Sequence, residues 1–179
     1  MTIRRVIVGL DPRPRGRPLL AAAAGLAEKM EAELVGLFVE NVDLLHFAAL
    51  PFAREVGVAS AAARPMNVPA MERGLRALAN EARRMLEGVA AQASVRCSFR
   101  VARGAEPAEL LAEGQEADLI VLSLTPAATL PRVAGMRVVM AGDSDALRTA
   151  LQSSAGVLVL AGEYPEQLAD TLRALLEEQ

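Results

Sequence analysis

The sequence predicts an α/β protein built as a doubly wound, open parallel sheet with helices on both faces and an extra C-terminal helix. Three observations support this prediction. Short, continuous apolar runs recur along the chain, as buried parallel strands require, and stretches with helical apolar spacing separate them. A helix also links the first two runs directly, which makes a βαβ unit with parallel strands. Elements that alternate in this way form a sheet covered on both faces.

The first βαβ unit occupies residues 6–39. Residues 6–10 are an apolar run closed by Asp11 and Pro12, and residues 34–39 are a second run. Between them, Pro18 stands where a helix begins, and apolar residues recur at helical spacing as far as Met30. The unit therefore predicts two parallel strands joined by a right-handed crossover.

The middle of the chain holds a long connection and a long helix. Residues 41–66 (Asn41 to Met66) contain one candidate short helix, at 43–50, and a connection of this length is often functional. It is interpreted either as a lid or simply as a long loop. The apolar residues from Met71 to Val89 then recur at the spacing of an amphipathic helix.

The third strand, at residues 95–101, differs from the others because apolar and polar side chains alternate along it. This pattern favours an edge strand, with Cys97 on the inward face as a buried, inert thiol. Pro107 opens a short helix, and residues 119–122 are a continuous apolar strand. The chain ends with a candidate strand from Arg137 to Met140, a helix, a buried-type strand from Val157 to Leu160, and a leucine-rich helix that starts at Pro165.

Length and composition predict one domain of 179 residues, with a core at 1–162 and a C-terminal helix at 163–179. The longest apolar stretch, residues 19–27, is about half of the ~20 residues that a membrane span needs, and the N-terminus does not resemble a signal peptide. A net charge of −3 provides no basic field for nucleic acid. We therefore expect a cytoplasmic protein with neither membrane nor nucleic-acid partners.

The residues that carry common enzyme chemistry are scarce. A single cysteine, Cys97, excludes an internal disulfide and a thiolate metal cluster. A single histidine, His46, leaves no serine triad and no histidine-rich metal site. The sequence contains neither a P-loop lysine motif nor a Gly-x-Gly-x-x-Gly motif. It therefore predicts a non-enzyme with no catalytic residues and no metal, and slow ATP hydrolysis is the one activity left open.

Three segments together resemble the universal stress protein family: VIVGLD at 6–11, AELVGLFVE at 32–40, and GAEPAELL at 104–111 leading into residues 117–122. They cover most of residues 1–123, and residues 142–160 match more loosely. The resemblance implies a five-stranded parallel sheet in the order 3-2-1-4-5 and a homodimer. Many members of the family bind ATP, and others do not.

The same resemblance implies where a ligand would lie. In this strand order the winding reverses between strands 1 and 4, so a ligand binds at their carboxyl ends. Asp11 ends strand 1, Ser123 ends strand 4, and Thr125 follows close by. In ATP-binding members the aspartate after strand 1 contacts ribose, and a residue that matches Val39 contacts adenine.

The phosphate-binding glycine motif of the family, Gly-x2-Gly-x9-Gly-Ser/Thr, is altered here. Ser123 and Pro126 occupy its first two positions, and the final pair is Gly142 with Asp143 or Ser144, reached only across an insertion. Glycines let backbone N–H groups approach a phosphate, whereas proline has no N–H and an aspartate at a helix start repels a triphosphate. We therefore expect a degenerate crevice with no firmly implied cofactor; ATP or AMP held by an altered loop is the alternative.

Arg13, Arg15 and Arg17 surround Gly16 at the start of the first helix. Helix N-termini favour anions, and arginine pairs well with phosphate or carboxylate. One hypothesis is that this loop replaces the glycine motif and holds a different anion. The other interpretation is that these are ordinary exposed arginines of a solvated loop.

The predicted partner is a second copy of the chain. In the order 3-2-1-4-5 the strand from Val157 to Leu160 lies at a sheet edge, although its sequence is that of an interior strand, and such an edge must be covered. We therefore predict a homodimer through residues 157–176, that is, through this strand and the C-terminal helix. The candidate strand from Arg137 to Met140 is either an added edge strand or the insertion that replaced the phosphate loop.

The function predicted from these observations is that of a universal-stress-protein-like binding or regulatory protein, dimeric, with an unknown protein partner and a degenerate nucleotide crevice. One alternative is a stress protein that binds ATP or AMP through an altered phosphate loop. Another is a purely structural interaction module with a collapsed crevice.

Overall fold

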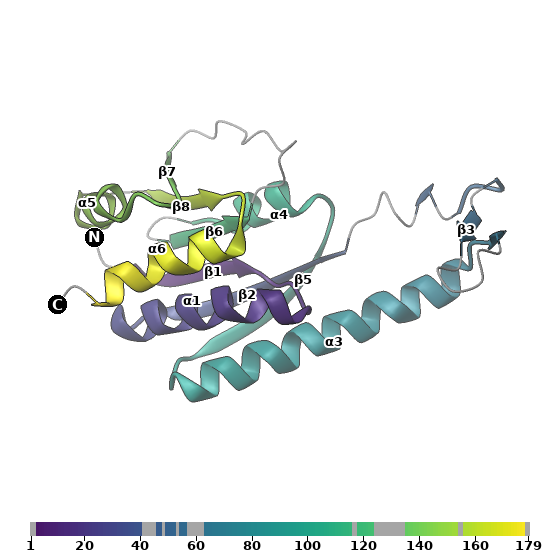
Figure 1. Cartoon of the computed structure of the whole chain (residues 1–179), viewed down its shortest axis with the longest axis horizontal. Coiled ribbons are helices and arrows are strands. Elements are labelled where there is room, and N and C mark those ends of the chain that lie inside the picture. The colour runs from purple at the N-terminus through teal and green to yellow at the C-terminus, as the bar shows by residue number, and fades with distance from the viewer. Residues whose placement is uncertain are drawn as a thin grey trace.

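Six parallel strands form one sheet in the order β5-β2-β1-β6-β8-β7. The computed structural model in Figure 1 describes residues 3–40, 46–47, 49–52, 54–56, 63–115, 118–123, 135–153 and 156–177. Chain order gives the strands as β1 (Arg5–Gly9), β2 (Glu33–Glu40), β5 (Cys97–Arg103), β6 (Asp118–Ser123), β7 (Met136–Met140) and β8 (Val157–Gly162). The predicted doubly wound parallel sheet is confirmed. Five of its strands follow the predicted order, and β7 is an added sixth.

The prediction that the strand from Val157 to Leu160 lies at a sheet edge is wrong. Leu158 of β8 is paired with Leu119 of β6 on one side and with Arg137 of β7 on the other. Both backbone edges of β8 are therefore occupied, so this strand cannot pair with a second chain. Its interior-type sequence suits its position, since Leu158, Val159 and Leu160 are fully buried. Of the two interpretations of Arg137–Met140, the added edge strand is the correct one.

The helices cover the two faces of the sheet unequally. Helices α1 (Arg17–Lys29), α3 (Val68–Gln92), α5 (Ser144–Ser153) and α6 (Pro165–Glu177) contribute to one apolar cluster. Of the described helices, α4 (Glu106–Glu113) alone contributes to the cluster on the other face. The inserted strand explains the position of α5. From β7 to β8 the chain moves in the same direction as from β1 to β2, so a right-handed crossover places α5 on the α1 face.

The C-terminal helix α6 packs on its own chain, as Figure 1 shows, where it lies along α1. Leu168 and Leu172 are fully buried, and Lys29 Nζ donates a hydrogen bond to the carbonyl oxygen of Leu175 at 2.7 Å. A Cβ on Gly25 of α1 would lie 3.2 Å from Leu176, so glycine at this position allows the close approach of the two helices. The predicted extra helix is confirmed, and it covers the face of the sheet rather than the edge of β8.

A projecting arm follows β2. Its described parts include two helical residues, His46 and Phe47, turns at residues 49–52, and a small antiparallel hairpin of β3 (Arg54–Val56) and β4 (Ala63–Pro65). The hairpin lies at the far end of α3, which extends well beyond the sheet (Figure 1). Asn67 caps α3 by accepting a hydrogen bond from the Ala70 backbone N–H at 3.0 Å. Half of the candidate helix at 43–50 (residues 43–45 and 48) lies outside the described residues, and residues 46 and 47 are helical. In the part of the chain that the structure describes, no helix is long and apolar enough to cross a membrane.

Candidate functional site

The point where the winding of the sheet reverses lies between β1 and β6, which pair in parallel from Arg5–Asp118 to Val8–Val121. The crossover that leaves β1 runs over one face through α1, and the crossover that enters β6 runs over the other face through α4. Ligands of doubly wound sheets bind outside the carboxyl ends of the strands at such a point. Asp11 follows β1 there, and Ser123 ends β6 beside it.

Asp11 is the centre of a short, self-contained loop. Its Oδ1 accepts hydrogen bonds from Arg13 Nε at 2.7 Å and from the Arg13 backbone N–H at 3.1 Å, and its Oδ2 accepts one from Arg15 Nε at 3.0 Å. The 3-10 turn η1 (Pro14–Gly16) closes the loop, and a Cβ on Gly16 would lie 2.4 Å from the backbone oxygen of Asp11. Glycine is therefore required where the loop folds back.

The two arginines also control the ionisation of Asp11. Partial burial by itself raises the pKa of the carboxyl, but the hydrogen bonds from Arg13 and Arg15 outweigh burial and hold the pKa below its ordinary value. The carboxylate is therefore negative at neutral pH. Its side chain is 26% exposed, while those of Arg13 and Arg15 are 64% and 59% exposed, so water screens both ion pairs.

In the loop that was predicted to bind an external anion, two of the three arginines already pair with the carboxylate of Asp11. Arg13 and Arg15 are directed to Asp11, and Arg17 is exposed at the start of α1. An external anion would have to share these arginines with a carboxylate. The structure brings Asp11, Arg13 and Arg15 together, but as an internal charge cluster.

Val39 lies near the carboxyl end of β2, where it is half-buried and packs against the apolar cluster on the α4 face. The neighbouring Glu40, missed by the sequence analysis, is 7% exposed, and its Oε2 accepts a hydrogen bond from Arg103 Nε at 2.8 Å. The backbone N–H of Gly104 also donates to the Glu40 carbonyl oxygen. The only sequence signal was an acidic residue that ends an apolar strand. The pair ties β2 to the edge strand β5.

Gly142 and Ser144 lie away from Asp11. They follow β7, which β8 and β6 separate from β1, so three strand spacings of about 4.8 Å place them about 14 Å from the β1 end. The Gly142 backbone N–H donates to Thr171 Oγ1 at 2.8 Å, and Asp143 Oδ1 accepts from the Ala146 N–H at 2.9 Å as the cap of α5. These amides are already used within the chain. Thr125 and Pro126 lie outside the described residues.

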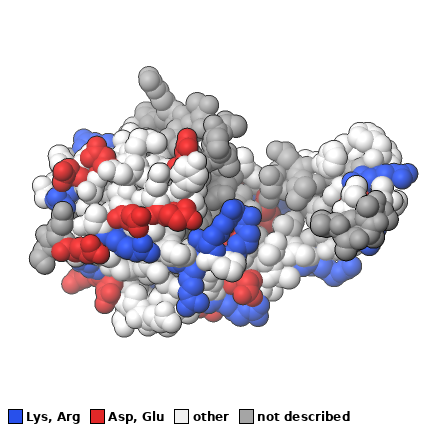
Figure 2. Space-filling model, in the orientation of Figure 1, with Lys and Arg blue, Asp and Glu red and all other residues white. Residues whose placement is uncertain are grey.

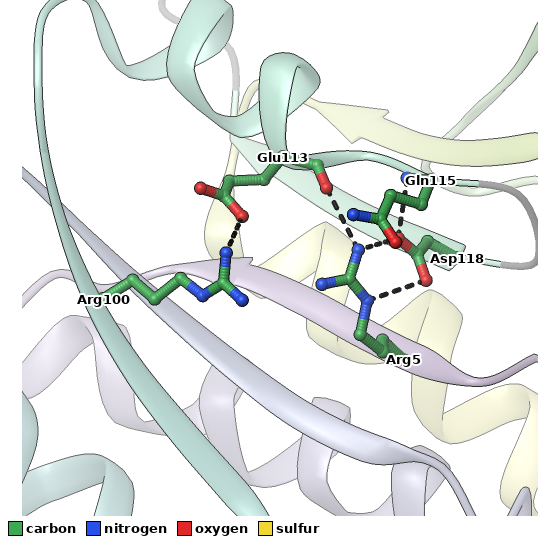
Figure 3. A network of polar contacts seen from close by, with 5 residues as sticks. All are labelled: Arg5, Arg100, Glu113, Gln115 and Asp118. Carbon is green, nitrogen blue, oxygen red and sulfur yellow. Dashed lines mark hydrogen bonds and ion pairs between the residues drawn. The ribbon is translucent and has the colours of Figure 1, made fainter.

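A second polar network lies at the opposite, amino ends of the strands (Figure 3). Arg5 Nε donates to Asp118 Oδ1 at 3.0 Å, a second arginine nitrogen pairs with Oδ2, and the Gln115 backbone N–H donates to Oδ2 at 2.7 Å. Arg5 also donates to the carbonyl oxygen of Glu113, whose side chain pairs with Arg100. The hydrogen bond to Asp118 raises the pKa of Arg5, although burial opposes it. This network joins β1, β6 and the end of α4, and it lies far from Asp11.

The two remaining candidate side chains, His46 and Cys97, lie away from the carboxyl ends of β1 and β6. His46 is exposed on the arm. Cys97 is half-buried rather than fully buried, and burial, followed by Glu87 and Glu33, raises the pKa of its thiol. Among the described ranges, no three His, Cys, Asp or Glu side chains gather as a metal site. Figure 2 shows positive and negative side chains interspersed over the body of the molecule on this face, without a field of one sign.

Two hollows lie elsewhere on the described surface. One of about 530 Å³ lies at the end of the arm, lined by residues that include Leu50, Pro65 and Val68. The other, of about 340 Å³, lies between the end of α1 and the segment before β5, beside Glu31 and Arg96. Neither hollow includes Asp11 or Ser123.

No protein-family model matches the chain, and no curated protein matches it. Several solved structures are similar to it, and two of them are universal stress proteins. One is a universal stress protein in complex with cAMP, with 15% sequence identity and a TM-score of 0.44, covering 90% of this chain and 98% of that one. The other is the universal stress protein UspA from Lactobacillus plantarum, with 16% identity and a TM-score of 0.45, covering 89% and 98%. Identity this low assigns no residue a role.

Proposed function

We propose that the protein is a cytoplasmic, non-catalytic binding or regulatory protein of the universal-stress-protein type, in which residues 1–179 act as one domain and the nucleotide crevice has degenerated. The observation that carries this proposal is that two of the polar groups expected to hold a nucleotide, the Asp11 carboxylate and the Gly142 backbone N–H, are already bonded within the chain. Asp11 accepts three hydrogen bonds from its own loop, and the Gly142 amide donates to Thr171.

A triphosphate would meet three obstacles. Its phosphates need free backbone N–H groups, but the first turn of α5 is capped by Asp143, whose negative charge repels them. Its ribose needs acceptor capacity on Asp11, of which the arginines have taken most. A ligand that reached both Asp11 and Gly142 would also have to cross two intervening strands.

The test is a thermal-shift titration with ATP, ADP and AMP, with and without Mg²⁺. A ligand that binds only the folded state raises Tm by mass action, so even a millimolar site gives a rise at several millimolar ligand. We expect no rise for wild type. A clear, saturable rise would contradict the degenerate crevice and favour the alternative function.

That alternative is an adenine-nucleotide-binding stress protein that uses an altered phosphate loop. One observation favours it: Arg13 and Arg15 are more than half exposed beside the crevice, and exposed ion pairs contribute only about 0–1 kcal/mol, so a phosphate could displace Asp11 from them. In that case the Arg13→Ala/Arg15→Ala variant would lose the thermal shift. Arg173→Ala, which removes an exposed arginine paired on α6, would keep it. Phosphate release from ATP, measured on the same proteins, tests slow hydrolysis.

The proposal includes self-association, through a surface other than β8. Both edges of β8 are paired, and the leucines of α6 are buried against their own chain. A regulatory dimer therefore needs a different contact. Light scattering of the wild-type protein at micromolar concentration tests this part of the proposal, independently of any nucleotide.

A further inference from the structure

Arginine and proline alternate in the loop that follows β1, called here the arginine loop and defined as residues 11–17. Residues 11–18 read Asp-Pro-Arg-Pro-Arg-Gly-Arg-Pro. Proline fixes φ and lacks a backbone N–H, so the three prolines stiffen this segment and remove three of its backbone donors. The side chains of Arg13, Arg15 and Arg17 are therefore the main donors that the loop can offer to an anion.

The backbone of the arginine loop is held by bonds that do not involve the carboxylate of Asp11. The Gly16 backbone N–H donates to the carbonyl oxygen of Arg13 at 2.9 Å, and the Arg17 N–H donates to that of Pro14. Gly16 also lies so close to the backbone of Asp11 that a Cβ would overlap the carbonyl oxygen there. We therefore expect the turn that positions the arginines to survive a change of the Asp11 side chain.

The arginine loop lies where the winding of the sheet reverses, beyond the carboxyl end of β1. Ligands of doubly wound sheets bind at such a point. Solvent reaches the side chains of Arg13 and Arg15, which are 64% and 59% exposed, and Arg17 is exposed as the first residue of α1. The first turn of α1 reads Arg-Pro-Leu-Leu and carries no carboxylate that would repel an anion.

One anion already lies between two of these arginines, namely the carboxylate of Asp11. Its Oδ1 lies 2.7 Å from Arg13 Nε and its Oδ2 lies 3.0 Å from Arg15 Nε, so each oxygen meets one guanidinium group. Both ion pairs are exposed to water, which makes them weak. A phosphate group carries more charge and more acceptor oxygens than a carboxylate, so it is the stronger partner for the same guanidinium groups.

We propose that the arginine loop binds a phosphate group and that Asp11 regulates this binding as an internal competitor. A phosphate group must displace the carboxylate, which is tethered two and four residues from its arginines and competes at an effective concentration of about a millimolar or more. Asp11 therefore weakens the binding of every external anion by the same factor, and only the anions that arginine binds most strongly stay bound. The proposal rests on the proposed function for the position of the crevice, and it requires no nucleoside.

The first experiment measures the affinity for inorganic phosphate by phosphorus NMR at neutral pH and constant ionic strength. We expect Asp11→Asn to bind phosphate about tenfold more tightly than wild type, because the change removes both a competitor and a repulsive charge. Asparagine has nearly the same size, and its Oδ1 can still accept the Arg13 backbone N–H, so the turn is kept. Adding Arg13→Ala and Arg15→Ala to Asp11→Asn should abolish the gain.

Asp170→Asn is the matched control. Asp170 pairs with Arg173 on α6 at 2.8 Å, and their side chains are 73% and 46% exposed, so the same substitution releases an exposed arginine outside the arginine loop. We expect no gain in phosphate affinity for this variant. An equal gain would show that any released arginine suffices and would overturn the proposal, as would equal affinities of wild type and Asp11→Asn. Circular dichroism checks that the variants are folded.

The second experiment does not depend on the folding of Asp11→Asn. It compares the weaker phosphate binding of wild type with that of Arg13→Ala/Arg15→Ala and of Arg173→Ala. We expect binding to be lost in the double variant and kept in Arg173→Ala. Phosphate binding that survives in Arg13→Ala/Arg15→Ala would locate the site elsewhere and overturn the proposal.

AMP distinguishes a site for a phosphate group from a site for a nucleotide. AMP carries its phosphate as a monoester, so Asp11→Asn should gain affinity for AMP and for inorganic phosphate by similar factors. A gain for AMP alone would overturn the proposal, because adenosine would then supply the affinity. If ATP raises the Tm of wild type and Asp11→Asn gains phosphate binding, the degenerate crevice is wrong and this proposal stands. If neither effect is seen, the degenerate crevice stands and this proposal is wrong.

Discussion

At the residue scale, the ionisation of Asp11 follows directly from its hydrogen-bond partners. Its carboxylate accepts hydrogen bonds from Arg13 and Arg15, which lower its pKa in the folded protein despite partial burial. A carboxyl with a lower pKa in the folded state stabilises that state when it is ionised. The stabilisation is present above the unfolded pKa, about 3.9, and is lost as the pH falls through the folded value.

This sign leads to a pH prediction. Wild type should be more stable than Asp11→Asn at pH 6, by no more than about 1 kcal/mol because the pairs are exposed, and the difference should shrink below about pH 4. Urea unfolding of both proteins between pH 3 and pH 7 measures it. The Arg13→Ala/Arg15→Ala variant is the control and should lose the same pH-dependent difference. A difference that grows on acidification would show that the assigned direction of the pKa shift is wrong.

The same residues show the limits of residue-level prediction. The end of an apolar run placed Asp11 after the first strand, because strand ends follow from local pattern. The arginines were expected to face an external anion, yet two of them bind a carboxylate two and four residues away. The choice between internal and external partners depends on side-chain directions, which composition does not contain.

At the scale of elements, the inserted strand β7 changes the sheet more than any other feature. It takes the edge that β8 was predicted to occupy, and it moves α5 to the α1 face. The sequence pattern predicted this strand but not its position in the sheet. Strand order follows from competition between long-range pairings, and the interior-type sequence of Val157–Gly162 does not say which strand lies on its outer side. The edge position of β5, in contrast, was predicted and is confirmed, since exposure at an edge leaves alternating polar residues in the sequence.

The network at the amino ends of the strands yields an element-scale prediction. Asp118 is 1% exposed, and Arg5 supplies its charged partner, so Arg5→Ala leaves a buried carboxylate that keeps the hydrogen bond from the Gln115 backbone N–H but has lost its cation. Such a loss costs about 3–5 kcal/mol. Arg100→Ala breaks the exposed pair with Glu113 in the same network and should cost about 0–1 kcal/mol. Chemical denaturation measures the free energy of unfolding of both variants. Equal losses of this free energy would contradict the larger stabilising role assigned to Arg5.

At the scale of the whole molecule, the C-terminal helix is integral to the core rather than an appendage. Leu168, Ala169 and Leu172 are fully buried, and the helix covers α1 and part of the sheet. Each fully buried leucine contributes about 1.5–3 kcal/mol. The two leucines Leu168 and Leu172 together contribute about 3–6 kcal/mol, a large part of the stability of a typical domain, which is about 5–15 kcal/mol.

A truncation therefore tests whether the predicted core at 1–162 folds without the helix. A chain that ends at residue 162 should lose its cooperative unfolding transition, because the apolar face of α1 would be exposed. A chain that ends at residue 177 keeps all of α6 and should unfold like the full-length protein. Differential scanning calorimetry measures both. A cooperative transition at unchanged Tm for the shorter chain would show that α6 is dispensable.

The sequence by itself determined the α/β class, the parallel strands, the helical segments and the absence of familiar catalytic motifs. Each of these depends on spacing within a short window, where side chains alternate by strand or helix period. Only the tertiary structure decided the place of β7 outside β8, the pairing of Asp11 with its own loop, the distance between Asp11 and Gly142, and the projection of α3 beyond the sheet. These features depend on which distant segments meet, and the free energy of such contacts is set by the whole fold.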